Sequence, residues 1–199
     1  MKKIGILYDH YKESNILIQN TRKDRNKYFL YLFLIMSFNL IFLIYPNEIL
    51  EIFNQFLQKE YSITSSIIYV IIQSSCWLLI THLLIQYLRS SVNIERQYDY
   101  ISRLENEIGK IIKTKVFDRE GKDYLKDYPL ILDILDFYYK RIVPVIILFL
   151  NGVKLFFEYI NSVCLFLKVV DSICYVVIFF LILLYLSYLN SPSDDEKKQ

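Results

Sequence analysis

The chain has 199 residues, of which 54% are hydrophobic and 17% aromatic, and its formal net charge is +2. This composition is too apolar for a disordered chain, and it leaves too few polar residues to cover a soluble domain. A net charge close to zero gives no basic signal for nucleic acid, so we expect no nucleic-acid partner. The three cysteines lack the paired CxxC spacing of a zinc or redox site, which favours a role in apolar packing.

Four charge-poor runs alternate with more polar segments. A run of about 20 apolar residues is long enough to cross a hydrocarbon layer roughly 30 Å thick. Because backbone in lipid must satisfy its own hydrogen bonds, each run is predicted to be a helix. The fold class is therefore predicted to be all-α: an integral membrane four-helix transmembrane protein with a cytoplasmic helical hairpin. The predicted segments are an arm at 1–27, spans at 28–45, 63–88, 142–160 and 172–189, outer segments at 46–62 and 161–171, a cytoplasmic part at 89–141 and a tail at 190–199.

The arm at 1–27 is predicted to be helical, since it has no proline and its one glycine is at position 5. Its basic cluster TRKDRNK leads directly into the first apolar run, so we expect arm and span to form one helix. No small-residue cleavage site follows that run, which favours a retained span over a signal peptide. The basic cluster either sets the orientation of the span or binds anionic headgroups.

Lys and Arg alternate in number along the chain. They count 7, 1, 11, 1 and 2 over 1–27, 46–62, 89–141, 161–171 and 190–199. The positive-inside rule therefore predicts that both termini and the large middle segment lie in the cytoplasm, beneath an inner (plasma) membrane. This alternation fits four spans and does not fit three.

The acidic segment at 46–62 has apolar residues at helical spacing. It is predicted to form a short amphipathic helix on the outer face of the membrane, or to extend a neighbouring span. Its apolar positions are Ile49, Ile52, Phe53, Phe56 and Leu57.

The second span carries polar side chains on two faces. Ser75, His82 and Gln86 fall within one narrow arc, and Ser66 and Gln73 lie roughly opposite. Polar groups in lipid turn toward the bundle interior or toward one another. The functional interpretation is a wet path, a pore lining or a protonation switch at His82, and the structural alternative is hydrogen bonding between helices.

A heptad-like stripe follows the second span, and only Gln97 interrupts it. No helix breaker separates the two, so one long helix is expected to continue out of the membrane. The stripe is the candidate face for a partner or for oligomer formation. It consists of Ile94, Ile101, Leu104, Ile108 and Ile111.

The chain is expected to turn near Gly121 and to return as a helix from Pro129. Asp136 and Lys140 are four residues apart in this helix and are expected to pair. Ile131, Ile134, Leu135 and Tyr138 match a packed face. Interleaved Lys and Arg residues favour a solvated surface over a metal site for the acidic side chains here, which are Asp118, Glu120, Asp123, Asp127, Asp133 and Asp136.

Lys154 and Glu158 share one face of the third span. A lone charge in the middle of a bilayer is costly, so a structural pair near the outer leaflet is one interpretation, and an oligomer contact or a pore position is the other. Pro144 and Asn151–Gly152 predict a bend in this span. The candidate membrane polar face is Gln73, Ser75, His82, Gln86, Lys154 and Glu158.

No motif of catalysis or cofactor binding is present. The chain has no nucleophile elbow, P-loop, HExxH or glycine-rich dinucleotide loop, and its two histidines are too few for a typical zinc or haem site. We therefore expect no enzymatic activity, no cofactor and no bound metal.

Two stretches carry a resemblance. LYDHYKES followed by RKDRNKYFLYLF, and YISRLENEIGKII followed by FDREGKDYLKDYPLILD, resemble segments of small bacterial multi-span membrane proteins of the kind encoded with anti-phage defence systems. The resemblance implies a membrane-perturbing or signalling role and transfers no functional residue, and a two-span effector layout departs from the four spans predicted here.

These observations predict a homo-oligomeric membrane effector or pore-type component acting on the lipid bilayer. The alternative is a non-conducting anchor or sensor that recruits a cytoplasmic protein partner through 89–141. A membrane enzyme or small transporter ranks third.

Overall fold

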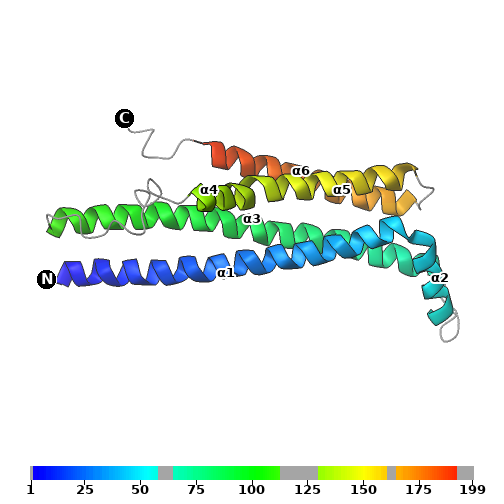
Figure 1. Ribbon diagram of the computed structural model, residues 1–199, viewed down its shortest axis with the longest axis horizontal. Helices are drawn as coiled ribbons and strands as arrows, with labels where there is room; N and C mark the ends of the chain where they lie inside the picture. The colour runs from blue at the N-terminus through cyan, green and yellow to red at the C-terminus, as the bar shows by residue number, and fades with distance from the viewer. Residues whose placement is uncertain (1, 58–64, 113–129, 161–164, 192–199) are drawn as a thin grey trace. The chain divides into compact units, whose positions relative to one another are not determined.

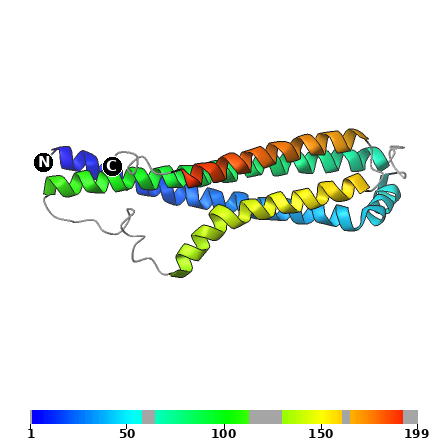
Figure 2. The same ribbon diagram turned by 90° about the horizontal axis from the view of Figure 1, so that it is seen from above.

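The computed structural model describes residues 2–57, 65–112, 130–160 and 165–191 (Figures 1 and 2). All of these residues are helical except Tyr45 and Ser191. The described part of the chain contains no strand, so the predicted all-α class is confirmed.

The chain divides into two compact units. Unit 1 consists of Met1–Tyr28 and Gln86–Lys140, and unit 2 of Phe29–Ile85 and Arg141–Gln199.

Helix α1 runs without interruption from Lys2 to Ile44. Its 43 residues extend about 65 Å at the usual rise per residue. The arm and the first span therefore form one helix, as predicted. The helix ends before Tyr45, because a proline disfavours the helical conformation of the residue that precedes it. Pro46 then begins α2 (Pro46–Leu57), where a proline in the first turn costs no hydrogen bond.

Helix α3 is also continuous, from Ser65 to Ile112, and has 48 residues. It contains no proline, and its one glycine is near its end. The predicted continuation of the second span into a long helix is confirmed.

The third span is entered through an irregular helix. Helix α4 (Leu130–Phe137) passes into a π-helical segment, Tyr138–Ile142, and then into α5 (Val143–Ile160). Pro144 explains the change, because its ring crowds the carbonyl of Lys140 and it has no N–H to donate. Widening the turn before the proline relieves that clash, and single π turns of this kind are frequent at functional sites.

Helix α6 runs from Leu165 to Asn190 and begins earlier than the span predicted at 172. The outer connection predicted over 161–171 is therefore helical from Leu165 onward. Helices α5 and α6 pack against each other. A Cβ at position 152 would lie 3.0 Å from the Tyr175 hydroxyl, so Gly152 leaves room for the Tyr175 ring.

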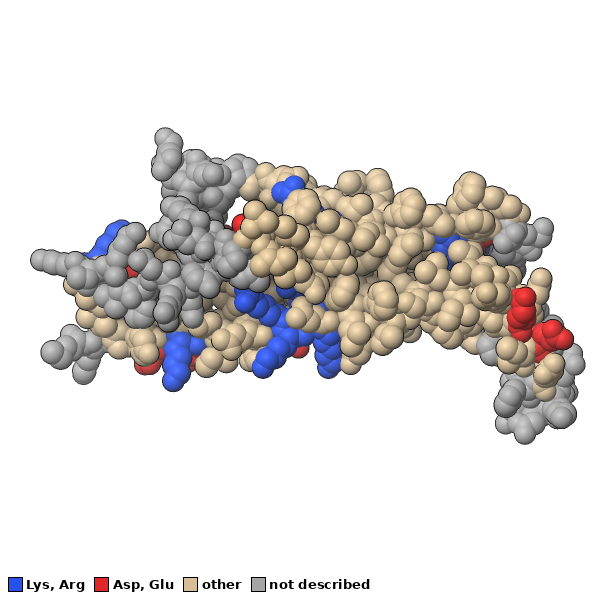
Figure 3. All heavy atoms as spheres, viewed as in Figure 1, with Lys and Arg blue, Asp and Glu red and all other residues tan. Residues whose placement is uncertain are grey.

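Four helical stretches are long and apolar enough to cross a membrane: Ile4–Ile44, Tyr69–Ile112, Asp133–Ile160 and Leu165–Asn190. Their outward surfaces are strongly apolar, and Phe149 and Leu184 are each 68% exposed. On the face shown in Figure 3, the surface over α5 and α6 is almost entirely uncharged. Lipid would cover this surface, and the chain is a multi-pass membrane protein.

In unit 1 the predicted stripe of α3 packs against the arm of the same chain. Ile101 and Leu104 form a buried cluster with Tyr11 and Ile18 of α1. Ile94 and Ile108 are also buried, whereas Ile111 is 39% exposed. The stripe was predicted to be free for a partner or an oligomer, and that prediction is wrong for its four buried members. The arm was the partner that the heptad pattern alone did not identify.

The packed face predicted for the returning helix is wrong for three of its four members. Ile131, Ile134 and Leu135 on α4 are exposed, whereas Tyr138 is half-buried. The stripe of α3 is already occupied by α1, so α4 has no such surface to cover these side chains.

Some predictions lie outside the described residues. These are residues 58–64 of the outer segment and the second span, the turn around Gly121, the start of the returning helix at Pro129, most of the acidic cluster (Asp118, Glu120, Asp123 and Asp127), Cys164 and the tail from 192 onward. The side chains of Phe53, Phe56, Leu57 and Ser66 are not described either.

The seam between α1 and α3 yields a matched test. Ile101→Ala should lower the local free energy of opening in unit 1 by about 2–4 kcal/mol, because it removes a fully buried side chain. Hydrogen exchange of residues 7–18 measures this loss. Ile111→Ala, on the same helix but half-exposed, is the control. Equal exchange rates in the two variants would contradict the packing.

Candidate functional site

Charged side chains are buried inside unit 2. Lys154 is 2%, Glu158 6% and Asp171 0% exposed, and these are the only charged residues buried in the described part of the chain. Helix α5 places Lys154 and Glu158 on its buried stripe, one turn apart. Helix α6 places Asp171 on its own buried stripe with Leu167 and Cys174. The spacing of three and four residues turns all three charges inward.

Lys154 and Glu158 form the ion pair that the sequence predicted. The Lys154 Nζ lies 3.2 Å from Glu158 Oε1. The same oxygen accepts a hydrogen bond of 3.2 Å from Gln73 Nε2 of α3. The ammonium also lies 4.6 Å from the centre of the Trp77 indole, within the range of a cation–π contact. Helices α3 and α5 are thereby joined through one carboxylate.

Sequence reasoning missed Asp171. Its carboxyl lies beside Glu158, Lys154 and Trp77. Neither of its oxygens has a well-formed hydrogen bond among the described residues, although the indole of Trp77 and the carboxyl group of Glu158 lie close enough to interact with it. The expected connection at 161–171 hid this residue. A usable signal was present, because 165–171 contains no glycine or proline and Asp171 continues the inward stripe of Cys174 and Ile178.

The cluster carries one positive and two negative groups when all are ionised. A buried ion without a counter-charge costs several kcal/mol, even after relaxation. Lys154 balances only one of the two carboxylates, so the cluster as a whole attracts a further cation. This imbalance is the chemical property that distinguishes the site from an ordinary structural ion pair.

A small pocket adjoins the cluster. Its polar lining is Asn39 of α1 together with Asn151 and Lys154 of α5. The Asn151 amide donates to the Ile147 carbonyl oxygen at 2.7 Å. Asn39 is 3% exposed, and neither atom of its amide has a partner among the described residues. Lys154 therefore lies between this polar pocket and the two carboxyl groups.

The predicted polar face of the second span divides in two. Gln73 faces the interior of unit 2 and bonds to Glu158, whereas Ser75 and His82 are exposed. Gln86 belongs to unit 1 and is partly buried. Ser75 and His82 do not face the interior of the single chain, because the apolar residues Trp77, Ile80 and Leu84 occupy that face of α3.

No group of three or more His, Cys, Asp or Glu residues suited to a metal ion occurs in the described ranges. The cluster of unit 2 has two carboxyls and an ammonium, which can hold or transfer a proton but form a poor cage for a metal.

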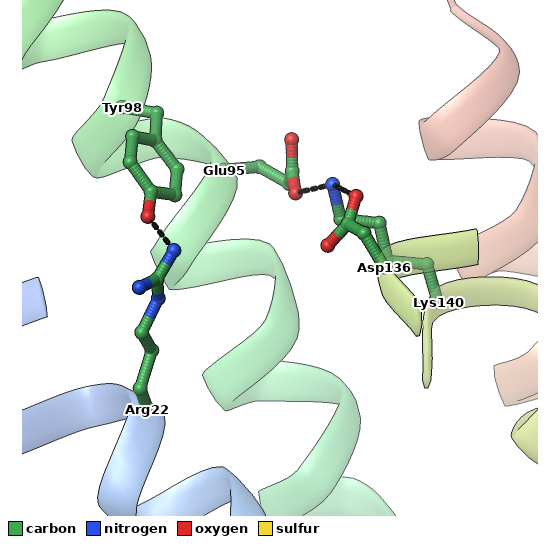
Figure 4. A network of polar contacts seen from close by, with 5 residues as sticks. All are labelled: Arg22, Glu95, Tyr98, Asp136 and Lys140. Carbon is green, nitrogen blue, oxygen red and sulfur yellow. Dashed lines mark hydrogen bonds and ion pairs between the residues drawn. The ribbon is translucent and has the colours of Figure 1, made fainter. Parts of the chain in front are cut away.

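Unit 1 contains a second polar network, around the π-helical segment (Figure 4). Lys140 lies between Glu95 of α3 and Asp136 of α4 and pairs with both, which confirms the predicted Asp136–Lys140 pair. Arg22 of α1 donates to the Tyr98 hydroxyl of α3.

Tyr139 extends these contacts within unit 1. Its backbone carbonyl oxygen accepts a 2.5 Å hydrogen bond from the Tyr87 hydroxyl. The guanidinium of Arg25 lies 5.0 Å from the centre of the Tyr139 ring. The residues that precede α5 are thus held by both α1 and α3.

The charge balance of the cluster predicts unequal effects of neutralising its members. Lys154→Met leaves two buried carboxyls without a cation and should destabilise the protein by about 3–5 kcal/mol. Asp171→Asn leaves the Lys154–Glu158 pair balanced and should cost less. Thermal unfolding in detergent micelles measures both, with Lys168→Met on α6 as the control. A larger loss for Asp171→Asn than for Lys154→Met would contradict this account.

Comparison of the sequence with protein families and with curated proteins, and of the structure with solved structures, finds no match.

Proposed function

We propose that this chain is a homo-oligomeric, pore-type component of a bacterial inner membrane, and that the cluster of Lys154, Glu158, Asp171 and Gln73 is its ion-handling site. The observation that carries the proposal is the burial of three charged groups between helices whose outer surfaces suit lipid. Ionisable residues inside membrane spans are rare and costly, and they commonly mark paths for ions or protons. The setting in anti-phage defence stays a prediction from the sequence resemblance.

A purely structural role explains the cluster less well. A structural ion pair needs one cation and one anion, and apolar residues of similar volume often stabilise a fold as well as a buried pair does. Asp171 adds a second carboxyl group whose oxygens lack a hydrogen-bond partner among the described residues, and Lys154 is the one cation that acts on both carboxyl groups there. Retaining such a group inside the bundle is expected where an ion passes or binds.

The proposed orientation puts both termini and unit 1 in the cytoplasm. The alternation of Lys and Arg numbers along the chain supports it. In this orientation the basic residues of unit 1 would lie near anionic headgroups.

Unit 1 supplies a route for control. Its network holds Tyr139 and Lys140, and α5 follows these residues directly in the chain. A cytoplasmic event that loosened this network would free the π-helical segment and allow α5 to shift or rotate. Small shifts of packed helices are a common form of gating transition.

Ser75 and His82 support the oligomer. Both are exposed on the α3 surface of the single chain, within the second span. Polar side chains facing lipid are unfavourable, and contact with a second copy would satisfy them.

The alternative, a non-conducting anchor or sensor, is favoured by a different observation. The apolar residues of α4 are exposed, although the α3 stripe is covered by the arm. A partner would then bind α4, and Ile131→Asp would abolish partner capture without changing ion permeability.

Flux measurements test the proposed pore. Purified protein in vesicles should pass monovalent cations down a gradient. Asp171→Asn should lower the rate about tenfold, which corresponds to a barrier higher by about 1.4 kcal/mol. Glu51→Gln, an exposed acid on α2, is the control. Absence of flux from the wild-type protein at every density in the vesicles would contradict the proposal.

Reporter fusions test the orientation. Fusions at both ends of the chain should report the cytoplasm, and a reporter inserted after residue 60 should report the opposite side. Ends in different compartments would rule out four spans with the proposed orientation.

A further inference from the structure

The carboxyl groups of Glu158 and Asp171 lie beside each other inside unit 2, and their hydrogen-bonding capacity is incompletely satisfied there. Glu158 Oε1 pairs with Lys154 and accepts from Gln73. Both oxygens of Asp171, together with Glu158 Oε2 and Gln73 Oε1, have no hydrogen-bond partner among the described residues. Asp171 and Gln73 are 0% and 2% exposed, so bulk water does not satisfy them. Four acceptor atoms therefore remain open around one ion pair.

The unpartnered oxygens also belong to a cluster that lacks one positive charge. Two adjacent carboxyl groups do not both ionise readily in a site of low dielectric constant, because each raises the free energy of the other's anion. Lys154 compensates one negative charge and leaves the second without a counter-charge. A single additional positive charge would make the cluster neutral.

The surrounding helices do not supply that charge. Among the described residues, the other titratable groups near the cluster are Tyr69 and Cys76 of α3 and Cys174 of α6. None of these carries a positive charge in any protonation state. Helix α1 contributes Met36, Asn39 and Leu40 to the adjoining pocket, and none of them titrates.

A proton fits the site better than a metal ion does. The described residues offer no group of three or more His, Cys, Asp or Glu side chains that could hold a metal ion. A metal ion would keep its full charge close to the ammonium of Lys154, which lies 3.2 Å from Glu158 Oε1, whereas a bound proton turns a carboxylate into a neutral carboxyl group. A proton needs only one carboxyl oxygen to bind and a second to receive the hydrogen bond.

We propose that Glu158 and Asp171 together bind one exchangeable proton, with Lys154 as the fixed counter-charge, so that the ion handled by this bundle is H⁺. Uptake forms one O–H bond on a carboxyl oxygen, and release returns the proton to water. No bond between heavy atoms changes. This inference rests on the proposed function, because it identifies the ion that the proposed ion-handling site would bind.

Infrared spectroscopy of the protein in vesicles tests the inference without measuring flux. The C=O stretch of a protonated carboxyl group is separate from the bands of a carboxylate. Spectra recorded over a pH series should show one such group per chain, and its band should disappear at high pH. Asp171→Asn and Glu158→Gln should each abolish the band, since each leaves Lys154 with one carboxylate. Glu51→Gln should retain it.

A double variant provides the decisive comparison. Glu158→Gln combined with Lys154→Met leaves Asp171 as the only charged group of the cluster, so the protonated band should return. Circular dichroism confirms that each variant is folded. A band that persists in both single variants would overturn the proposal, as would a band displaced by Na⁺ at constant pH. Flux without the band would overturn the proton site and leave the pore, whereas the band without flux would overturn the pore and leave the proton site.

Discussion

An ammonium group held 3.2 Å from a carboxylate oxygen, between helices that otherwise suit a hydrocarbon environment, is the interaction on which unit 2 depends. Without Lys154, two carboxyl groups would be buried together with no cation, and they could remain buried only if they were protonated. With it, α5 is joined to α3 through Gln73 and Trp77, and Asp171 of α6 lies beside the same pair. The cluster that holds the helices of unit 2 together is therefore also the place where a mobile ion would have its strongest electrostatic interaction with the protein.

Unit 1 is built on a different principle. Its helices α1 and α3 meet along an apolar seam of Tyr11, Ile18, Ile101 and Leu104, of the kind that soluble helical proteins use. Charged and aromatic contacts near Tyr139 and Lys140 then hold the start of the third span. Both long helices continue from this seam into membrane spans. A change in unit 1 is accordingly connected through the backbone, and not only through side-chain contacts, to the segments that carry the buried cluster.

Much of the fold follows from the sequence, and the reasons are physical. Apolar runs in lipid must be helical, and the lack of proline before Pro46 and within 65–112 made α1 and α3 predictable as continuous helices. The pairs Lys154–Glu158 and Asp136–Lys140 followed from the spacing of residues on a helix. Packing partners did not follow, because a heptad stripe records that a face is buried and not which helix buries it.

The errors at the site have the same origin. Gln73 and Ser75 are two residues apart on α3 and both are polar. The packing of α5 against α3 decides that Gln73, and not Ser75, faces the interior. Asp171 was hidden because it was the last residue of the predicted connection at 161–171, where a charged side chain would face water. In the structure Asp171 lies on the buried stripe of α6, where a charged side chain does require an explanation.

The π-helical segment at Tyr138–Ile142 has a geometric consequence for α5. A π turn contains one residue more than the turn it replaces, and one residue corresponds to about 100° of rotation in an α-helix. The direction in which Asn151, Lys154 and Glu158 point from the axis of α5 therefore depends on the extra residue in the π-helical segment that precedes this helix. If the π-helical segment became a regular α-helical turn, α5 would rotate about its axis by about this angle, and Asn151, Lys154 and Glu158 would turn away from Gln73.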